Sequence, residues 1–207
     1  MTSLLMREGV LKRIEAEHAE ESVWIVGPET GRLLHFLIRV VAPKIAVEIG
    51  TSVGYSALWM SSGLEKNGFG KLWTIESHAE RFERAQKNIE EAKMGEWVSQ
   101  VKGHAPEIFA NLELPGKVDF VFLDATKLEH QSYLDVLLPL LAPGAIIAVD
   151  NVQSHRFGPM AEFVEHLHAD PRFEVVEIPV GSGLLIARST GEVGPGPEEA
   201  ASLNPLN

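Results

Sequence analysis

The stretch from Val47 to Ser56 constrains this chain more than any other, because an apolar strand there runs through a tight glycine turn into a helix. A strand, turn and helix in this order bring backbone N–H groups and a helix N-terminus to one edge of a sheet, which favours a nucleotide-like or carboxylate-bearing cofactor. The two glycines, Gly50 and Gly54, are spaced Gly-x-x-x-Gly. The dinucleotide fingerprint instead needs Gly-x-Gly-x-x-Gly, so that the backbone can approach a pyrophosphate. The spacing therefore favours a cofactor without a diphosphate.

Apolar runs of strand length alternate along the chain with amphipathic helical patterns. This alternation is typical of an α/β fold in which helices cover both faces of a parallel sheet. Residues 120–123 are apolar at consecutive positions, which places their strand near the centre of the sheet. The predicted strands are 45–50, 72–76, 98–103, 118–124, 145–150, 173–180 and 183–188.

The last two predicted strands are separated only by the short region Gly181-Ser182. A parallel crossover needs a much longer connection, so these two strands are expected to pair as an antiparallel hairpin. The sequence thus predicts a Rossmann-like, doubly wound, mostly parallel seven-stranded sheet with a C-terminal antiparallel hairpin.

A helix is predicted to begin at Pro28, because proline is favoured in the first turn of a helix. Its apolar residues recur at helical spacing and are expected to form a buried stripe, namely Leu33, Phe36, Leu37 and Val40. No linker divides the chain, and its 207 residues suit a single domain with one core. Glycine, proline and glutamate in the segment 190–207 predict a disordered tail.

Charge and composition exclude several function classes. The formal net charge is -11 and no basic run occurs, which argues against a nucleic-acid partner and favours small molecules. The chain has no cysteine, so it has no disulfide framework, thiolate metal site or catalytic thiol. The N-terminus turns polar too soon for a signal peptide, and no apolar run approaches membrane-spanning length. We therefore expect a soluble cytoplasmic protein.

Acidic side chains stand where three of the predicted strands end. Glu76 follows Gly54 by about twenty residues, where a carboxylate can accept hydrogen bonds from the two hydroxyls of a ribose. Asp124 and the pair Asp150-Asn151 close two further strands, and together they offer three oxygen ligands for a hard cation such as Mg²⁺. The alternatives are a solvated glutamate at 76 and turn-forming Asp and Asn residues at the other two strand ends.

Lys127 lies three residues past Asp124, at the mouth of the same predicted site. A lysine beside a cation can act as a general base when desolvation and the positive charge lower its pKa toward neutrality. Most lysines are simply solvated, so the assignment depends on the placement of Lys127.

The ordered combination of these motifs resembles the class I methyltransferases that use S-adenosylmethionine (SAM), and specifically the metal-dependent O-methyltransferases of the catechol and caffeoyl-coenzyme A type. The matching segments are 26–31, 48–56, 74–76, 122–127, 141–144 and 149–151. The resemblance implies one class I methyltransferase domain over residues 1–189, in which N-terminal helices from residues 1–43 cover the active site. It leaves a homodimer open.

The resemblance also implies a role for individual positions. Asp124, Asp150 and Asn151 match the metal ligands of the family, and Lys127 matches its general base. A small acceptor with neighbouring hydroxyls would chelate the cation, lose a proton to Lys127 and attack the methyl group of SAM. The positions that match SAM-binding residues are Val26, Glu48, Gly50, Ser52, Gly54, Tyr55, Ser56, Glu76, His104, Ala105 and Asp124.

Three positions depart from the family pattern. The family often continues Asp-Ala-Asp-Lys with a tyrosine three residues later, whereas this chain has Thr126 and His130 at those places. The family hairpin usually carries Asp between two glycines, whereas this chain has Ser182. The identity of the acceptor therefore stays open.

Other functions remain as alternatives. A metal-independent SAM methyltransferase of unknown acceptor would not need the cation site, and a non-catalytic SAM-binding protein would need neither the cation nor Lys127. A nicotinamide-dependent oxidoreductase would share Glu76 but lacks its glycine spacing here. Trp24 is interpreted as core or interface packing that could also touch substrate. His155 is interpreted as a surface-loop residue, with a supporting role at the metal site as the alternative.

Overall fold

The computed structural model describes residues 3–20 and 24–191, in which strands alternate with helices as the apolar pattern predicts. Two short 3₁₀ helices, η1 (Lys127–Glu129) and η2 (Leu138–Leu140), flank α6. The α-helices are α1 (Ser3–Glu20), α2 (Pro28–Val41), α3 (Tyr55–Asn67), α4 (Ala79–Glu91), α5 (Ala105–Ile108), α6 (His130–Leu137) and α7 (Pro159–Ala169). The strands are β1 (Ile45–Ile49), β2 (Lys71–Glu76), β3 (Val98–Lys102), β4 (Val118–Leu123), β5 (Leu141–Asp150), β6 (Phe173–Ile178) and β7 (Leu184–Ser189).

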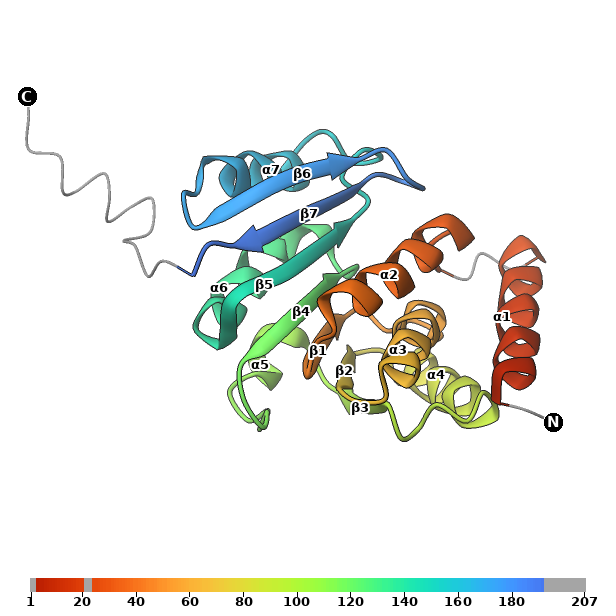
Figure 1. The fold of residues 1–207 in the computed structure, drawn as a ribbon. Helices are drawn as coiled ribbons and strands as arrows, with labels where there is room; N and C mark the ends of the chain where they lie inside the picture. Colours follow the sequence, from red (N-terminus) through yellow and green to blue (C-terminus); the bar gives the residue numbers. More distant parts are fainter. Residues whose placement is uncertain (1–2, 21–23, 192–207) are drawn as a thin grey trace, which may run out of the picture.

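The strands form one sheet in the order β3-β2-β1-β4-β5-β7-β6 (Figure 1). The first five strands along the chain run parallel to one another, whereas β7 pairs antiparallel with both β5 and β6. The strand β4 lies in the middle, and its residues 120–123 are completely buried. The predicted fold class, the central strand and the C-terminal hairpin are therefore confirmed.

Strand β5 begins at Leu141, earlier than the predicted start at Ala145. Leu141 pairs with Val118, but the next pair along the same ladder joins Ile146 to Phe120. The extra residues of β5 bulge out of the ladder at Gly144, whose φ of +79° is a conformation that glycine adopts freely. Pro143 and Gly144 therefore lie in an irregular part of a strand that is longer than predicted.

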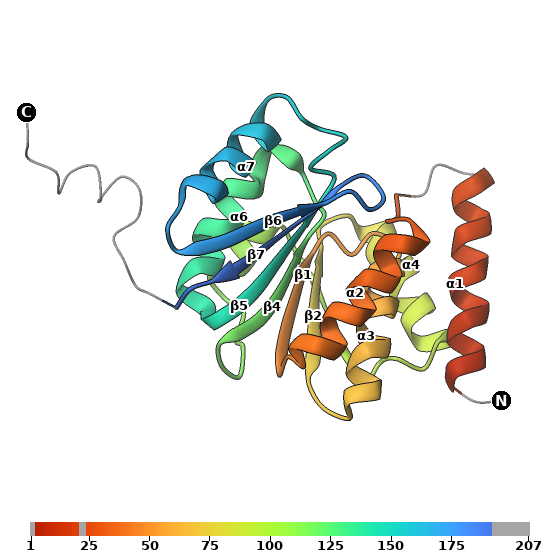
Figure 2. The ribbon, with the colours of Figure 1, turned by 45° about the horizontal axis from the view of Figure 1, so that its top comes forward.

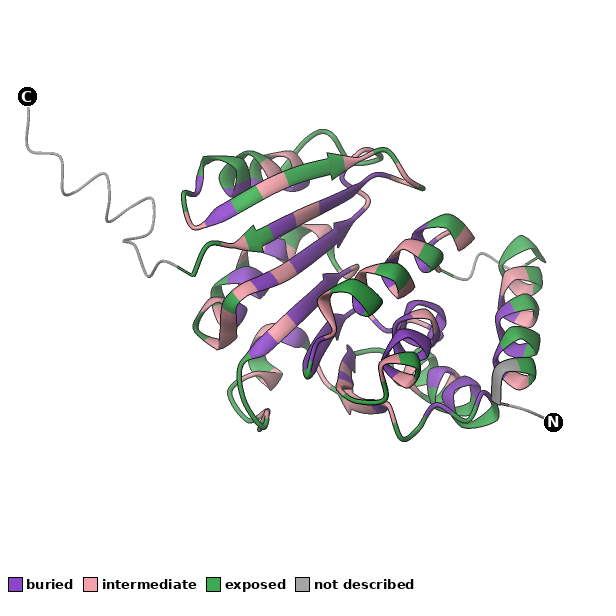
Figure 3. Ribbon diagram, viewed as in Figure 1, coloured by how far each residue is buried: buried purple, intermediate pink, exposed green. Residues whose placement is uncertain are grey.

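Helices α2, α3 and α4 lie on one side of the sheet, and α5, α6 and α7 lie on the other (Figures 1 and 2). Apolar side chains from each helical layer and the adjoining sheet face form a buried cluster, which Figure 3 shows as purple along the central strands. Helix α1 packs outside α3 and α4 through Val10, Leu11 and Ile14. Arg7 of α1 also forms a 2.6 Å ion pair with Glu65 of α3.

Helix α2 buries a different stripe from the predicted one. Leu34 and Ile38 are completely buried, whereas Phe36 and Val40 are 59% and 65% exposed. The rotation of the helix is set by Gly31, which lies so close to the ring of Trp59 on α3 that a Cβ atom there would overlap it. The prediction of a buried Phe36 and Val40 is therefore wrong for the single chain, although Leu33 and Leu37 are partly buried.

The glycine turn after β1 lies directly against the end of β4. Gly50 has a φ of +104°, and a Cβ atom at this position would overlap the carbonyl oxygen of Asp124. In addition, the Asp124 N–H donates to the Ile49 carbonyl over 3.0 Å. A residue with a side chain at position 50 would separate the two strand ends, so glycine here keeps the predicted cofactor turn beside Asp124.

Two predictions concern the ends of the chain and membranes. The predicted tail at 190–207 falls, apart from residues 190 and 191, outside the described residues. Within the described ranges, no helix has both the length and the apolar character that crossing a membrane needs.

Candidate active site

A cavity of about 440 Å³ opens where β1, β2, β3, β4 and β5 end. In open α/β sheets this carboxyl edge is the usual place for a ligand. The chain segment 24–27, between α1 and α2, also lines the cavity, whereas the described part of α1 lies elsewhere. The predicted site residues that line it are Val26, Gly50, Ser52, Glu76, His104, Ala105, Asp124, Lys127, Asp150 and Asn151.

Four predicted cofactor residues lie behind this cavity wall: Glu48, Gly54, Tyr55 and Ser56. Glu48 is completely buried and accepts hydrogen bonds from the hydroxyls of Ser56 and, at 2.5 Å, Thr74. Burial raises the pKa of Glu48 to about 7. The Tyr55 hydroxyl donates instead to Glu15 of α1 over 2.6 Å. In this structure the Glu48 carboxylate therefore joins β1 to the first turn of α3 and to β2, and the Tyr55 hydroxyl joins α3 to α1.

The carboxylate of Glu76 is held in a fixed orientation at one end of the cavity. Its two oxygens accept the backbone N–H groups of Ser52 and His78, each over 2.8 Å. Ser52 has a φ of +48°, in the left-handed region of the backbone. The Ser52 hydroxyl donates to the carbonyl of Trp24 over 2.6 Å. Ser52 therefore joins segment 24–27 to the glycine turn and to Glu76.

His104 lies on the same side of the cavity, between two carboxylates. Its Nδ1 is 2.5 Å from Glu107 Oε2, and its Nε2 is 3.1 Å from Glu129 Oε2. The hydrogen bond to Glu107 is the main reason that the pKa of His104 is raised. Tyr133 donates to the same oxygen of Glu129 over 2.5 Å, so the network links α5 to the turn that carries Lys127.

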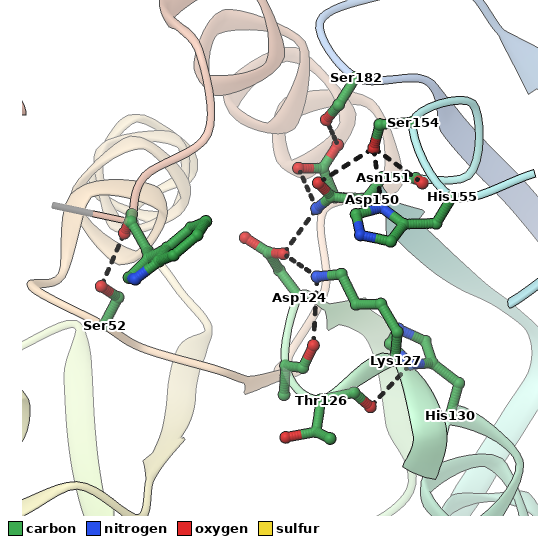
Figure 4. Close-up of polar contacts among 12 residues, drawn as sticks. Ser52, Asp124, Thr126, Lys127, His130, Asp150, Asn151, Ser154, His155 and Ser182 are labelled. Carbon is green, nitrogen blue, oxygen red and sulfur yellow. Dashed lines mark hydrogen bonds and ion pairs between the residues drawn. The ribbon is translucent and has the colours of Figure 1, made fainter. Parts of the chain in front are cut away.

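Two carboxylates and an amide meet at the other end of the cavity, where Asp150 is buried and the side chain of Asp124 is 21% exposed (Figure 4). The Asn151 amide nitrogen is 2.9 Å from Asp124 Oδ1 and 3.0 Å from Asp150 Oδ2. Asn151 has a φ of +70°, a conformation that asparagine tolerates better than most residues. Burial raises the pKa of Asp124 to about 6, with a smaller contribution from Asp150, and burial also raises the pKa of Asp150.

This donor set fits a hard divalent cation. Removal from water makes two neighbouring carboxylates unfavourable unless positive charge compensates them. The two ends of an asparagine amide have nearly the same shape, so Asn151 can present its oxygen in place of its nitrogen. Within residues 3–20 and 24–191, no three His, Cys, Asp or Glu side chains gather as a metal site, so the third ligand here would be the amide. Oxygen ligands of this kind suit Mg²⁺.

Lys127 points at the same acidic group (Figure 4). Its Nζ donates to Asp124 Oδ1 and to the Ala125 carbonyl, both over 3.1 Å. The side chain is partly buried and lines the cavity. Lys127 thus stands within one hydrogen bond of a predicted metal ligand, as a base for an acceptor at this end would require.

His130 supports the turn that carries Lys127. The ring is almost completely buried, edge-on to Phe163, and its Nδ1 is 3.1 Å from the carbonyl oxygen of Thr126. Burial lowers the pKa of His130 to about 4, so the ring is neutral near pH 7 and donates through Nδ1. The sequence shows His130 only as a departure from the family pattern, because this contact depends on how η1 packs on α6 and α7.

The cavity also contains residues that the motifs did not assign to it. Trp24 is 71% exposed and lines the cavity, so it is not a core residue. His155 is exposed, lines the cavity and has its Nδ1 2.9 Å from the Ser154 hydroxyl. Arg81 and Ser77 line it near Glu76. Their position just after the β2 strand end is the sequence signal that could have identified them.

Comparisons with known proteins agree on one family. A family model described as O-methyltransferase matches residues 3–190. Among curated proteins, catechol O-methyltransferase of Niastella koreensis is 37% identical over 129 residues, which span 61% of this chain and 58% of that protein. The match thus covers less than two thirds of the Niastella protein. Caffeoyl-CoA O-methyltransferase 1 of Arabidopsis thaliana is 30% identical over 199 residues, which span 86% of this chain and 76% of that protein.

Two solved structures are similar over most of the fold. The O-methyltransferase from Bacillus cereus in complex with SAH superposes with a TM-score of 0.77 and 27% identity, over 87% of this chain and 90% of that one. The O-methyltransferase TomG from Streptomyces achromogenes, in complex with SAM, superposes with a TM-score of 0.76 and 30% identity, over 88% and 90%.

Proposed function

This chain belongs to the O-methyltransferase family, and on that premise we propose that it transfers a methyl group from SAM to a hydroxyl of a small, catechol-like or phenolic acceptor with the help of a divalent cation such as Mg²⁺. The observation that carries the proposal is the meeting of Asp124, Asp150 and Asn151 beside Lys127 in one cavity. Glu76 stands in the same cavity with its carboxylate fixed by two backbone donors.

The Glu76 end of the cavity is the proposed SAM site. The similar structures from Bacillus cereus and Streptomyces achromogenes contain SAH and SAM, respectively. A carboxylate whose orientation is already fixed can accept the ribose hydroxyls without losing further side-chain freedom. His104 and Ala105 would border the adenine, and the turn at Gly50 and Ser52 would face the methionine part. Glu48, Gly54, Tyr55 and Ser56 would support this turn rather than contact SAM.

The acidic end is the proposed acceptor site, in which Asp124, Asp150 and Asn151 would hold the cation. When bound, a divalent cation lowers the pKa of a hydroxyl that coordinates it and orients a neighbouring hydroxyl. The chain supplies two neighbouring carboxylates whose pKa values are raised mainly by burial, and a bound cation would stabilise their charged forms. A catechol, with its adjacent hydroxyls, suits such a site better than an isolated alcohol does.

Lys127 is the proposed general base. Its neutral Nζ would take the proton of the reacting hydroxyl, whose oxygen forms a bond to the methyl carbon as the carbon–sulfur bond of SAM breaks. The products are the methyl ether, S-adenosylhomocysteine and a protonated Lys127. SAM is already an activated donor, so most of the remaining rate comes from holding the oxygen in line with the methyl group.

A methyl-transfer screen tests this function. Purified protein is incubated with labelled SAM and catechols, hydroxycinnamates, flavonoids or their coenzyme A thioesters, with and without Mg²⁺. We expect transfer to an acceptor with adjacent hydroxyls only when Mg²⁺ is present. Transfer that ignores the cation would instead identify a metal-independent methyltransferase. SAM binding without transfer to any acceptor would favour the non-catalytic alternative.

We also propose a homodimer, because an apolar surface remains uncovered on the α2 side of the sheet. Phe36 and Val40 are exposed on α2, and Val176 of β6 is 53% exposed. Val176 pairs with the partly buried Ile186 of β7, so both lie on the same sheet face. In the described chain, the helices on this side cover the other half of the sheet (Figure 1).

A second copy of the chain suits this surface for two reasons. Its exposed α2 residues follow a helical spacing that usually marks a buried face, and a twofold axis would pack this face against its own copy. The adjoining charges come in pairs, since Arg188 is 2.9 Å from Glu174 and Arg32 is 3.3 Å from Glu29. A surface that carries both positive and negative charges can be complementary to the same surface on a second copy of the chain.

A further inference from the structure

The turn between β6 and β7 is fixed against the loop that follows β5. The Ser182 carbonyl oxygen accepts the N–H groups of Gln153 over 3.0 Å and Ser154 over 3.1 Å. The Val152 N–H donates to the Gly183 carbonyl over 3.2 Å. These backbone hydrogen bonds join two segments about 30 residues apart in the sequence, and none of them uses a side chain of the turn.

Two glycines allow this close approach. Gly181 and Gly183 have φ values of +57° and +90°. A Cβ atom on Gly183 would overlap Gln153, and one on Gly181 would press on the hydroxyl of Thr30, which is itself buried in α2. Ser182 is therefore the residue of this turn whose side chain can reach the cavity, and it lines the wall next to Asp150.

The hydroxyl of Ser182 holds one oxygen of Asp150. Ser182 Oγ donates to Asp150 Oδ1 over 3.1 Å, while the other oxygen, Oδ2, is 3.0 Å from the amide nitrogen of Asn151 (Figure 4). Asp150 is 3% exposed, so its carboxylate has few other sources of hydrogen bonds. The hydrogen bond from Ser182 to Oδ1 fixes the plane of the Asp150 carboxylate. Oδ2 of Asp150 then stays directed at Asn151, which in turn contacts Asp124.

We propose that Ser182 is a positioning residue for the cation site, acting through Asp150. This inference rests on the proposed function, because it assumes that Asp150 binds the cation. Hydrogen bonds that orient a metal-binding carboxylate typically change metal affinity by about 10- to 100-fold when they are removed. The backbone bonds of the turn do not depend on the hydroxyl, so its loss should change the cation site without releasing the turn.

The test measures Mn²⁺ binding, not catalysis, by electron paramagnetic resonance of free Mn²⁺ in titrations of the full chain. We expect Ser182→Ala to weaken Mn²⁺ binding by about 10- to 100-fold. Ser182→Thr, which keeps the hydroxyl, should bind Mn²⁺ within about threefold of the wild type, and both variants should bind SAM as the wild type does. Ser77→Ala, at the Glu76 end of the cavity, is the matched control and should leave Mn²⁺ affinity unchanged.

Three results would overturn the inference in different ways. Equal Mn²⁺ affinity of Ser182→Ala and the wild type would remove the role of Ser182 and leave the proposed function intact. Parallel loss of Mn²⁺ and SAM binding in Ser182→Ala would show that the hydroxyl only maintains the fold. No Mn²⁺ binding by the wild type would overturn the proposed cation site as well. If Ser182→Ala does not fold, the nearly isosteric pair Ser182→Val and Ser182→Thr gives the same comparison.

Discussion

Lys127 Nζ lies 3.1 Å from Asp124 Oδ1, the same oxygen that accepts a hydrogen bond from the amide of Asn151. Lys127, the proposed base, and Asn151, a proposed metal ligand, therefore both donate a hydrogen bond to Oδ1 of Asp124. This contact keeps Lys127 at the acidic end of the cavity and limits the positions from which its Nζ can reach a bound hydroxyl. Changes at this pair should therefore affect the chemical step more than cofactor binding.

Lys127→Met should reduce turnover of the best acceptor by about 10²–10⁴, the usual effect of losing a general base. The loss should shrink at higher pH, because a hydroxyl beside a divalent cation ionises increasingly without help. The measurement is turnover against pH for both proteins, with SAM affinity as a second readout that should stay nearly unchanged. Lys117→Met, whose Nζ bonds to Pro139 away from the cavity, is the control. If Lys127→Met turned over at the wild-type rate at neutral pH, Lys127 would not be the general base.

Removal of divalent cations with EDTA should abolish methyl transfer, and Mg²⁺ or Mn²⁺ should restore it. Asp150→Ala should remain inactive after cations are added back, because one of the two carboxylates proposed to hold the cation is gone. Initial rates after dialysis and readdition of metal measure both effects. Full activity in the chelator would place this chain among the metal-independent enzymes.

Glu76→Ala should weaken SAM binding by roughly 1.5–3 kcal/mol, the usual contribution of a hydrogen bond to a charged group. Part of the loss would come from the N–H groups of Ser52 and His78, which lose their acceptor. Calorimetric titration with SAM measures the change, and Glu80→Ala, an exposed residue in the first turn of α4, serves as control. Unchanged affinity of Glu76→Ala would show that the ribose is not held there.

His130 should make the folded chain less stable in acid. The pKa of His130 falls from an ordinary 6.5 to about 4 in the folded chain. Between these two pH values the imidazole is protonated in the unfolded chain but neutral in the folded chain, so acid favours unfolding. Between pH 6.5 and pH 5 this difference should lower the free energy of unfolding by about 2 kcal/mol. Urea unfolding at several pH values should show a smaller decrease for His130→Phe. Parallel curves for the two proteins would contradict the buried neutral imidazole.

Phe36→Glu combined with Val40→Glu should convert the proposed dimer to a monomer. Two charges on the apolar surface of α2 would have to lose water in the interface. Light scattering after gel filtration should give the monomer mass of 22.7 kDa for the variant and twice that for the wild type. Phe69→Glu changes another exposed apolar residue, outside α2, and should stay dimeric. A monomeric wild type would refute the dimer.

The sheet and its hairpin could be predicted from sequence because they follow from local patterns. A consecutive apolar run such as 120–123 suits a strand buried on both faces, and a connection too short for a crossover allows only a hairpin. The stripe of α2 was predicted wrongly because helical spacing shows that an apolar face exists, not whether it meets the core of its own chain. Leu34 and Ile38 meet that core, whereas Phe36 and Val40 do not.

The candidate site could be predicted only in part. Strand ends of a parallel sheet share one edge, so Asp124 and Asp150 were expected to lie close together, and they do. The contacts of Ser182 and His130 depend instead on loops and helices that pack across long sequence separations. A pattern of residue types also does not show which way the Glu48 side chain points. In the structure it contacts Ser56 and Thr74 and does not line the cavity.

Gly50 packs directly on the backbone of Asp124, and the Asp124 N–H bonds to the Ile49 carbonyl, so the glycine turn and the end of β4 are held in one fixed relative position. Other parts of the cavity wall belong to connections that do not form this contact, namely segment 24–27, the turn at Ser182 and the loop with His155. Under the proposed function, natural or laboratory evolution would exchange these connections to fit other acceptors, while the separation of the proposed SAM and cation sites is inherited unchanged.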